Sequence, residues 1–241
     1  CALLNTSEHS RKGGWELTTR LVLPASKRPF LGRVLVRYKN LLALLLGACL
    51  VIPLGLFLLR PASVPDLSHG NGAGLQALTA AWDKGEMIVL VRHMERCDRS
   101  NAACLGPADG ITDRAREVAV GLGAQFEHLG LERTDIYNSP LTRTAQTASY
   151  MFSKVSSGDG WLFNCKNTML RDVMAHKVAG RNLVLVTHSE CMAQMEQDLK
   201  RATPTLGYGA SLFVSTDTLN GAPKMLGLIE ASDWRSVNLK P

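Results

Sequence analysis

The 241-residue chain carries a formal charge of +6, and this surplus is confined to its first 40 residues. That segment holds eight Lys or Arg and two Glu, which leaves 19 basic and 19 acidic residues in the rest of the chain. Because the rest has no positive surplus to offer a phosphate backbone, the charge excludes nucleic-acid binding as the main activity.

An uncharged, leucine-rich run at residues 41–59 follows the basic arm, residues 1–40. At about 1.5 Å per residue, a helix of this length comes close to the ~30 Å core of a bilayer, and Pro53 is tolerated in a membrane helix. The positive-inside rule places the arm in the cytoplasm and the remainder in the periplasm or outside. We therefore predict an uncleaved, single-pass inner-membrane anchor. The alternatives are a signal cleaved to release a periplasmic protein and, less favoured, a soluble core helix.

The chain has no methionine before Met87, so part of the arm is expected to precede the true start. Val34, read from an alternative start codon, would leave a compact basic region with Arg37 and Lys39. Residues 60–75 are rich in Pro, Ser and Gly and are predicted to link the span to one domain, residues 76–241.

Within that domain, apolar runs and helical patterns alternate. Three buried strands are predicted at 86–91, 134–137 and 182–187, and two late strands at 210–215 and 225–230. Helices are predicted at 113–128, 141–153, 168–178 and 190–201. The first is capped by Thr112, and its apolar face comprises Ala115, Val118, Ala119, Leu122 and Phe126. This alternation predicts an α/β, three-layer sandwich with a mostly parallel central sheet.

Arginine and histidine follow the predicted strands at the points where the strands end. Arg92 and His93 come after the first, and His188 follows 182–187. Arg143 lies in the first turn of a helix that opens after Pro140, near the positive end of the helix dipole. Because ligands gather at the carboxyl ends of strands in open α/β sheets, we expect these four side chains to share one site.

This quartet of side chains suits phosphoryl transfer through a histidine. Arg92, Arg143 and His188 would neutralise a phosphate, since guanidinium groups bind its oxygens in a planar, bidentate way. His93 would then attack phosphorus, and water would hydrolyse the phosphohistidine. No metal or other cofactor is expected, because side chains supply the positive charge.

These motifs resemble those of the histidine phosphatase superfamily, with Arg92-His93 in the place of its Arg-His-Gly motif, Arg143 as second arginine and His188 as second histidine. The similarity covers roughly Glu86 to the C-terminus and implies a phosphoglycerate mutase-like fold. The run Arg-His-Met-Glu-Arg-Cys-Asp-Arg-Ser, with Cys104 and Gly-Ile-Thr at 110–112, resembles the lipopolysaccharide core heptose(II)-phosphate phosphatases. Met94 replaces the motif's glycine and is expected to narrow the approach to His93.

Three carboxylates are candidates for the proton donor to the leaving group. Glu190 lies two residues after His188, where one branch of the superfamily carries an acid, and we favour it because it sits at the end of the strand that delivers His188. Asp172 stands where another branch places its acid, and Glu95 is close to His93 in sequence. Glu95 is equally compatible with substrate binding or with a salt bridge to Arg96 or Arg99.

Four cysteines fall in the predicted domain, an even number that suggests disulfides in an oxidising compartment. Of the three possible pairings, we favour Cys97 with Cys104 and Cys165 with Cys191. Free buried thiols are the alternative. A metal site is disfavoured because the spacing lacks Cys-x-x-Cys.

The sequence therefore predicts a membrane-anchored, periplasm-facing, metal-independent phosphomonoesterase. The resemblance implies that its substrate is a phosphorylated sugar, the heptose phosphate of the lipopolysaccharide core. Two alternatives remain open at this stage. One is a catalytically silent phosphate- or glycan-binding module, and the other is a phosphoprotein or phosphohistidine phosphatase.

Overall fold

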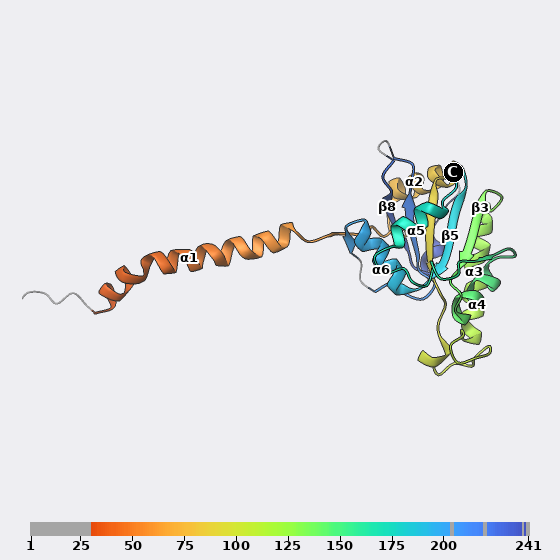
Figure 1. Ribbon diagram of the computed structural model, residues 1–241, viewed down its shortest axis with the longest axis horizontal. Helices are drawn as coiled ribbons and strands as arrows, with labels where there is room; N and C mark the ends of the chain where they lie inside the picture. The colour runs from red at the N-terminus through yellow and green to blue at the C-terminus, as the bar shows by residue number, and fades with distance from the viewer. Residues whose placement is uncertain (1–29, 203–204, 219–220, 238, 240–241) are drawn as a thin grey trace, which may run out of the picture. The chain divides into compact units, whose positions relative to one another are not determined.

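The computed structural model describes the backbone of residues 30–202, 205–218, 221–237 and 239, and the side chains of these residues from 38 onward (Figure 1). The chain divides after Leu59 into two compact units. The first contains the helix α1, Phe30–Leu58, and the second contains all the strands named below. The basic arm is predicted to lie in the cytoplasm. Residues 1–29 of this arm lie outside the described residues, and its remaining residues form the start of α1.

The helix α1 is apolar over Tyr38–Leu58, with a mean hydropathy of 2.7 across its most apolar window, and the large side chains of this segment are exposed. Its 21 residues are long enough to cross a bilayer, and Pro53 lies inside the helix. A signal sequence has the same length and composition. The segment thus agrees with either a single-pass span or a signal, and the start at Val34 stays a prediction.

The second unit is built on a six-stranded sheet in the order β4-β3-β5-β2-β7-β8. The strands are β2 Met87–Arg92, β3 Thr134–Asn138, β4 Ser156–Ser157, β5 Asn182–Thr187, β7 Ser211–Ser215 and β8 Lys224–Ile229. The first four of that order run parallel, whereas β7 and β8 are antiparallel additions at one edge. The predicted mostly parallel sheet is confirmed, although the sheet is mixed.

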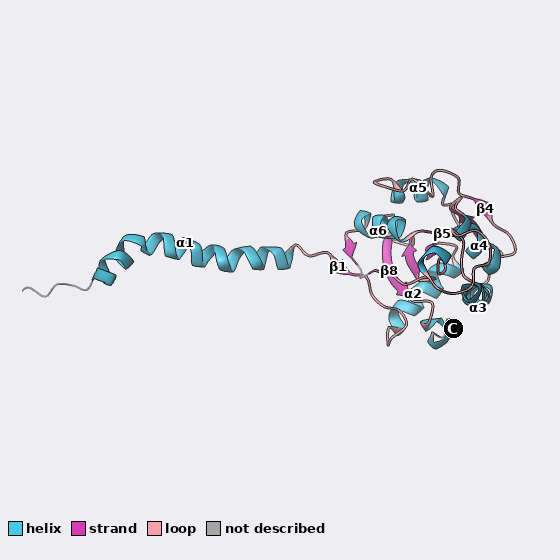
Figure 2. Cartoon of the chain, turned by 90° about the horizontal axis from the view of Figure 1, so that it is seen from below, coloured by secondary structure: helices cyan, strands magenta, loops and turns pink. Residues whose placement is uncertain are grey.

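Helices cover both faces of this sheet, which gives the predicted three layers (Figure 2). Along β2, Val89 and Val91 pack into one core and Ile88 and Leu90 into the other, as alternation along a strand requires. The first core includes residues of α2 Gly72–Asp83, α3 Asp113–Leu129 and α4 Thr142–Met151. The second includes residues of α5 Met169–His176 and α6 Ser189–Asp198.

The helix α3 begins as predicted, because the Thr112 side chain accepts a hydrogen bond from the Ala115 backbone N–H at 3.3 Å. Four of the five predicted core positions of this helix are buried. Val118 is the exception, with 45% of its surface exposed. At about 100° per residue, a position three after Ala115 falls at the edge of the apolar stripe, so Val118 faces away from the core.

Residues 60–75 differ from the predicted linker, because much of this segment belongs to the domain. The strand β1, Ala62–Ser63, pairs in parallel with β6, Arg201–Ala202. Leu67 is completely buried, and α2 begins at Gly72, where the Asn71 side chain accepts from the Gly74 N–H at 2.9 Å. A Pro, Ser and Gly composition predicts a flexible segment, but it does not show that Leu67 has an apolar site within the core.

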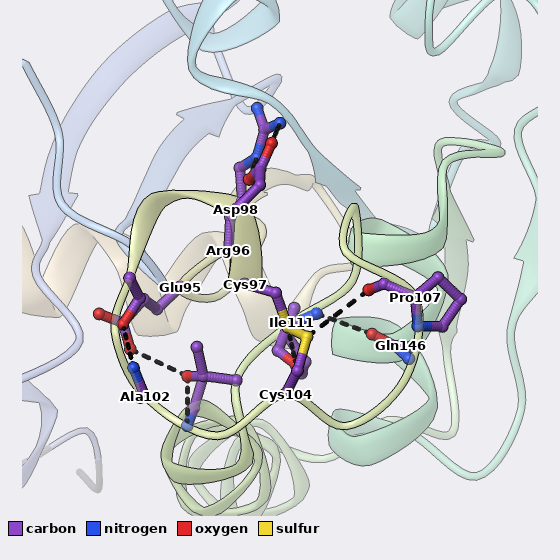
Figure 3. Close-up of a disulfide and its surroundings, with 12 residues drawn as sticks. Glu95, Arg96, Cys97, Asp98, Ala102, Cys104, Pro107, Ile111 and Gln146 are labelled. Atoms are coloured by element: carbon purple, nitrogen blue, oxygen red, sulfur yellow. Dashed lines mark hydrogen bonds and ion pairs between the residues drawn. A yellow bond between two sulfur atoms is a disulfide. The ribbon is translucent and has the colours of Figure 1, made fainter.

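Both favoured disulfides are present. Cys97–Cys104 closes the loop that follows β2 (Figure 3). Cys165–Cys191 joins the segment before α5 to α6. The Cα atoms are 5.4 Å apart in each pair, which is within the usual range.

Thiol alkylation of the native, detergent-solubilised protein should therefore label none of these four cysteines before reduction. Cys49 in α1 is a free thiol within the apolar segment, so labelling of Cys49 by a membrane-permeant maleimide serves as the positive control within the same chain. After reduction and denaturation all four should react. Labelling of Cys97 or Cys165 in the unreduced protein, read by peptide mass analysis, would show that the disulfides are absent.

Candidate active site

The end of β2 holds Arg92 and His93 in the middle of the sheet. The Arg92 N–H donates to the Ala210 carbonyl and the His93 N–H to the Thr187 carbonyl, each at 2.9 Å. The His93 Nδ1 lies 2.8 Å from the Met94 carbonyl oxygen. Because a carbonyl can only accept, Nδ1 carries the proton in the neutral ring, and Nε2 keeps its lone pair. His93 is therefore held in the tautomer that a nucleophilic Nε2 requires.

His188 joins His93 because β5 and β2 are parallel neighbours that end at the same level, with Arg92 opposite Thr187. The two imidazole rings lie edge to face with their centroids 5.5 Å apart. His188 precedes the first turn of α6, and its Nε2 is 2.8 Å from the Ser139 hydroxyl. Its Nδ1 is buried and has no hydrogen-bond partner among the described residues.

The two predicted arginines supply positive charge near His93. Arg143 is the second residue of α4, near the positive end of that helix. Arg92 donates to the Leu206 carbonyl and lies over the Tyr208 ring, 4.3 Å from its centroid. The Nε atoms of both arginines are buried and lack a hydrogen-bond partner among the described residues. We call Arg92, His93, Arg143 and His188 the cationic cluster.

The cationic cluster favours the binding of an anion, whose oxygens would accept hydrogen bonds from these unpartnered donors. Burial lowers the pKa of His93 to about 3, and the nearby His188, Arg143 and Arg92 lower it as well. Burial lowers the pKa of His188 to about 4, again with the help of Arg143. The pKa of Arg143 is lowered by burial and by Arg96. Both histidines are therefore neutral at neutral pH, and a bound dianion would relieve the mutual repulsion of the arginines.

Histidine titration should show these shifts directly. His93 and His188 should remain neutral from about pH 8 to about pH 5 in the free protein. An ordinary histidine, with a pKa of about 6.5, would become protonated within this range. His69 is an internal comparison, because hydrogen bonding to Asp66 raises its pKa. Ring-proton chemical shifts measured by nuclear magnetic resonance test this prediction. A midpoint near 6.5 for His93 would contradict the described environment.

Of the three candidate acids, Glu190 is the one that acts electrostatically on the cationic cluster. It lies in the first turn of α6, and its charge raises the pKa of His188 and of Arg143. Burial raises its own pKa, but hydrogen bonds from its backbone N–H and from the Ser189 hydroxyl oppose this effect, and the net change is a lowering. Glu190 is thus ionised in the free protein.

The other two carboxylates are held by partners of their own. Glu95 accepts from Arg114 at 2.7 Å and from the Thr112 hydroxyl at 2.9 Å, and the Arg114 bond is the main reason that its pKa falls to about 2. Neither Arg96 nor Arg99, the partners expected from the sequence, forms this ion pair. Asp172, on α5, accepts from the Arg171 Nε at 3.0 Å.

Three further residues contact the cationic cluster or act on it. Ser139 contacts His188, and Tyr208 contacts Arg92. The Tyr208 and His93 ring centroids are 5.6 Å apart. Arg96 pairs with Asp98 at 2.7 Å on the disulfide-closed loop, and its charge lowers the pKa of both Arg143 and His188 (Figure 3). In the sequence, the signal for Tyr208 is that it stands between two glycines, Gly207 and Gly209, which indicate a turn. The Gly209 backbone has a φ of +75°, a conformation that favours glycine.

Met94, expected to narrow the approach to His93, is almost fully buried. Its backbone N–H donates to the Thr147 hydroxyl at 2.9 Å, and its sulfur packs against Gly209.

One group among the described residues could hold a metal ion. Its ligand atoms belong to Asp66, His69 and Asp233 and lie within 4.8 Å of one another. Asp66 and His69 are exposed and already hydrogen bonded to each other at 3.0 Å. This group contains no member of the cationic cluster.

Comparison with known proteins identifies the family of the chain. No family model matches the chain. The chain is 31% identical over 166 residues to the lipopolysaccharide core heptose(II)-phosphate phosphatases of Salmonella choleraesuis and Salmonella typhi, which is 68% of this chain and 80% of each relative. A phosphoglycerate mutase from Bacillus anthracis shares the fold, with a TM-score of 0.50 and 12% identity over 64% of this chain and 98% of its own. The chain therefore belongs to the family of lipopolysaccharide core heptose(II)-phosphate phosphatases.

Proposed function

We propose that the protein is a metal-independent phosphomonoesterase that works through a phosphohistidine on His93. The observation that carries this proposal is a buried, neutral His93 whose Nδ1 is held by a carbonyl, beside unpartnered donors of Arg92, Arg143 and His188. These donors would bind the phosphate oxygens and neutralise the charge that otherwise repels a nucleophile.

In the first step, the His93 Nε2 forms a bond to phosphorus while the ester P–O bond breaks. The leaving oxygen takes a proton from Glu190 and departs as an alcohol. In the second step, a water oxygen attacks phosphorus, Glu190 accepts the water proton, and the P–N bond breaks to release phosphate. Glu190 must be protonated for the first step, and a bound phosphate dianion next to it would raise its pKa.

Glu190→Gln should therefore show a strong dependence on the leaving group. Turnover of alkyl phosphates should fall by about 10²–10⁴-fold, because a sugar alkoxide needs protonation. Turnover of nitrophenyl phosphate should fall much less, because nitrophenolate leaves without a proton. Steady-state kinetics with both esters measures the difference, and Asp172→Asn is the control. Equal losses with both esters would remove Glu190 from this role.

The proposed substrate is the heptose phosphate of the lipopolysaccharide core, with the domain anchored by α1 and facing the periplasm. The relatives' name supports the substrate. The length and composition of Tyr38–Leu58 support the anchor, and two disulfides suit an oxidising compartment. A cleaved signal would leave the same domain in the periplasm.

Mass analysis of lipopolysaccharide tests this assignment. Cells that express the protein should carry one phosphate fewer in the core than cells that lack it, and cells that express His93→Ala should resemble the latter. An unchanged core in cells that contain the active enzyme would exclude this substrate. In the purified protein, a chelator should leave turnover unchanged.

A further inference from the structure

Tyr208 contacts the cationic cluster and also lines a cavity. The cavity measures about 220 Å³ and is lined by Met94, Glu95, Arg114, Ala115, Val118 and Tyr208. The Tyr208 ring lies over Arg92 and next to His93. A phosphate bound to those two residues would therefore have this cavity close to its ester oxygen.

A second, larger cavity of about 780 Å³ continues along α3, and the two share Arg114 and Val118 as walls. Its farther walls include Gln125 on α3, and Ser232 and Arg235 near the end of the chain. We call the two cavities together the α3 groove. Its size suits an organic ligand larger than a phosphate ion, since ligand pockets typically span about 300–1,000 Å³.

The walls of the α3 groove combine apolar surface with polar groups. Near the cationic cluster, Met94, Ala115, Val118 and the Tyr208 ring provide apolar contact, with the Arg114–Glu95 ion pair beside them. Farther along, apolar surface comes from Leu122, Ala124, Ala231 and Trp234, and donors and acceptors come from Glu117, Gln125, Ser232 and Arg235. A sugar offers hydroxyls to these polar groups and C–H faces to the apolar walls, whereas an acyl chain would contact the apolar walls alone and would leave unpaired any polar group that it covers.

We propose that the α3 groove binds the saccharide of a phosphorylated oligosaccharide substrate. The phosphorylated ring lies against Tyr208 and Val118, and the next sugars extend toward Arg235. This proposal rests on the proposed function, since the phosphate must occupy the cationic cluster. It also gives exposed Val118 a role, because an apolar side chain 45% exposed would contact the sugar ring.

Two valines of α3 provide a matched test. Val118 lines both cavities, whereas Val120 is 53% exposed and is not among the lining residues of either. Val118→Trp should fill the groove and lower kcat/KM for phosphorylated core oligosaccharide by about tenfold or more, mainly through KM. Acetyl phosphate has no ring, so its turnover should stay within about twofold of the wild type. Val120→Trp should change neither substrate.

Arg235→Ala provides a second, milder test at the far end of the groove. It should weaken turnover of the oligosaccharide but not of mannose 6-phosphate, which is too short to reach it. Arg116→Ala is the control, because Arg116 is an arginine of α3 that pairs with Asp113 and is not among the residues that line the groove. All assays use the full chain in detergent, with lipopolysaccharide-derived core oligosaccharide and dioctanoyl phosphatidate as the long probes.

The outcomes separate this proposal from the proposed function. Equal effects of Val118→Trp and Val120→Trp on the oligosaccharide, with no selective effect of Arg235→Ala, would overturn the groove assignment even if acetyl phosphate is hydrolysed. A higher kcat/KM for phosphatidate than for oligosaccharide would also overturn it, in favour of a lipid ligand. A wild-type protein that turns over none of these esters would instead contradict the proposed function itself.

Discussion

His93→Ala is expected to lower kcat for phosphate esters by at least about 10⁴-fold, because it removes the atom that would form the bond to phosphorus. The side chain is buried, and among the described residues its hydrogen bond is to the Met94 carbonyl, so its loss leaves Arg92, Arg143 and His188 in place. Inorganic phosphate should therefore still inhibit or bind the variant. Steady-state kinetics and phosphate binding measure the two effects separately.

His128→Ala is the matched control for this experiment, since His128 is an exposed histidine near the end of α3. It should retain wild-type activity. If His93→Ala kept activity within about tenfold of the wild type, hydrolysis would proceed by direct attack of water, and the covalent mechanism would be wrong.

Arg143→Ala should lower kcat/KM by about 10³-fold or more, since an arginine that stabilises a transferring phosphoryl group contributes on that scale. Its buried Nε has no partner among the described residues and is available to a phosphate oxygen. Arg143→Lys should recover only a small part of the loss, because lysine keeps the charge but not the planar pair of donors.

A second readout distinguishes this role from a merely structural one. The charge of Arg143 lowers the pKa of His93, so its removal should raise that pKa while burial continues to hold it below 6.5. Nuclear magnetic resonance titration of Arg143→Ala measures the change. A fall in activity with no change in the His93 pKa would indicate that Arg143 lies farther from His93 than the structure places it.

The proximity of Arg92, His93, Arg143 and His188 was predictable from the sequence, because it follows from local patterns. Two apolar strands that run parallel and end at the same register bring His93 beside His188. The helix start after Pro140 sets Arg143 at a positive helix end. These relations depend on strand ends and helix starts, which composition and spacing reveal.

Contacts between distant loops could not be predicted in this way. Tyr208 reaches Arg92 because the loop before β7 folds back over the end of β2, where the Gly209 N–H donates to the Arg92 carbonyl at 3.1 Å. The partner of Glu95 is Arg114, 19 residues away, rather than a neighbour in sequence. Leu67 is buried although its neighbours indicate a linker, because the apolar site that receives it belongs to other elements.

The covalent intermediate can be tested most directly by rapid mixing of the full-length enzyme with a labelled phosphate ester. The reaction is quenched in base after less than one turnover, and the peptides are then analysed by mass spectrometry. The mechanism predicts phosphate on the enzyme, at most one per active chain, attached to His93 and absent from the His93→Ala variant. Phosphate on His188 or on another residue, or turnover with no phosphorylated enzyme at any quench time, would contradict it.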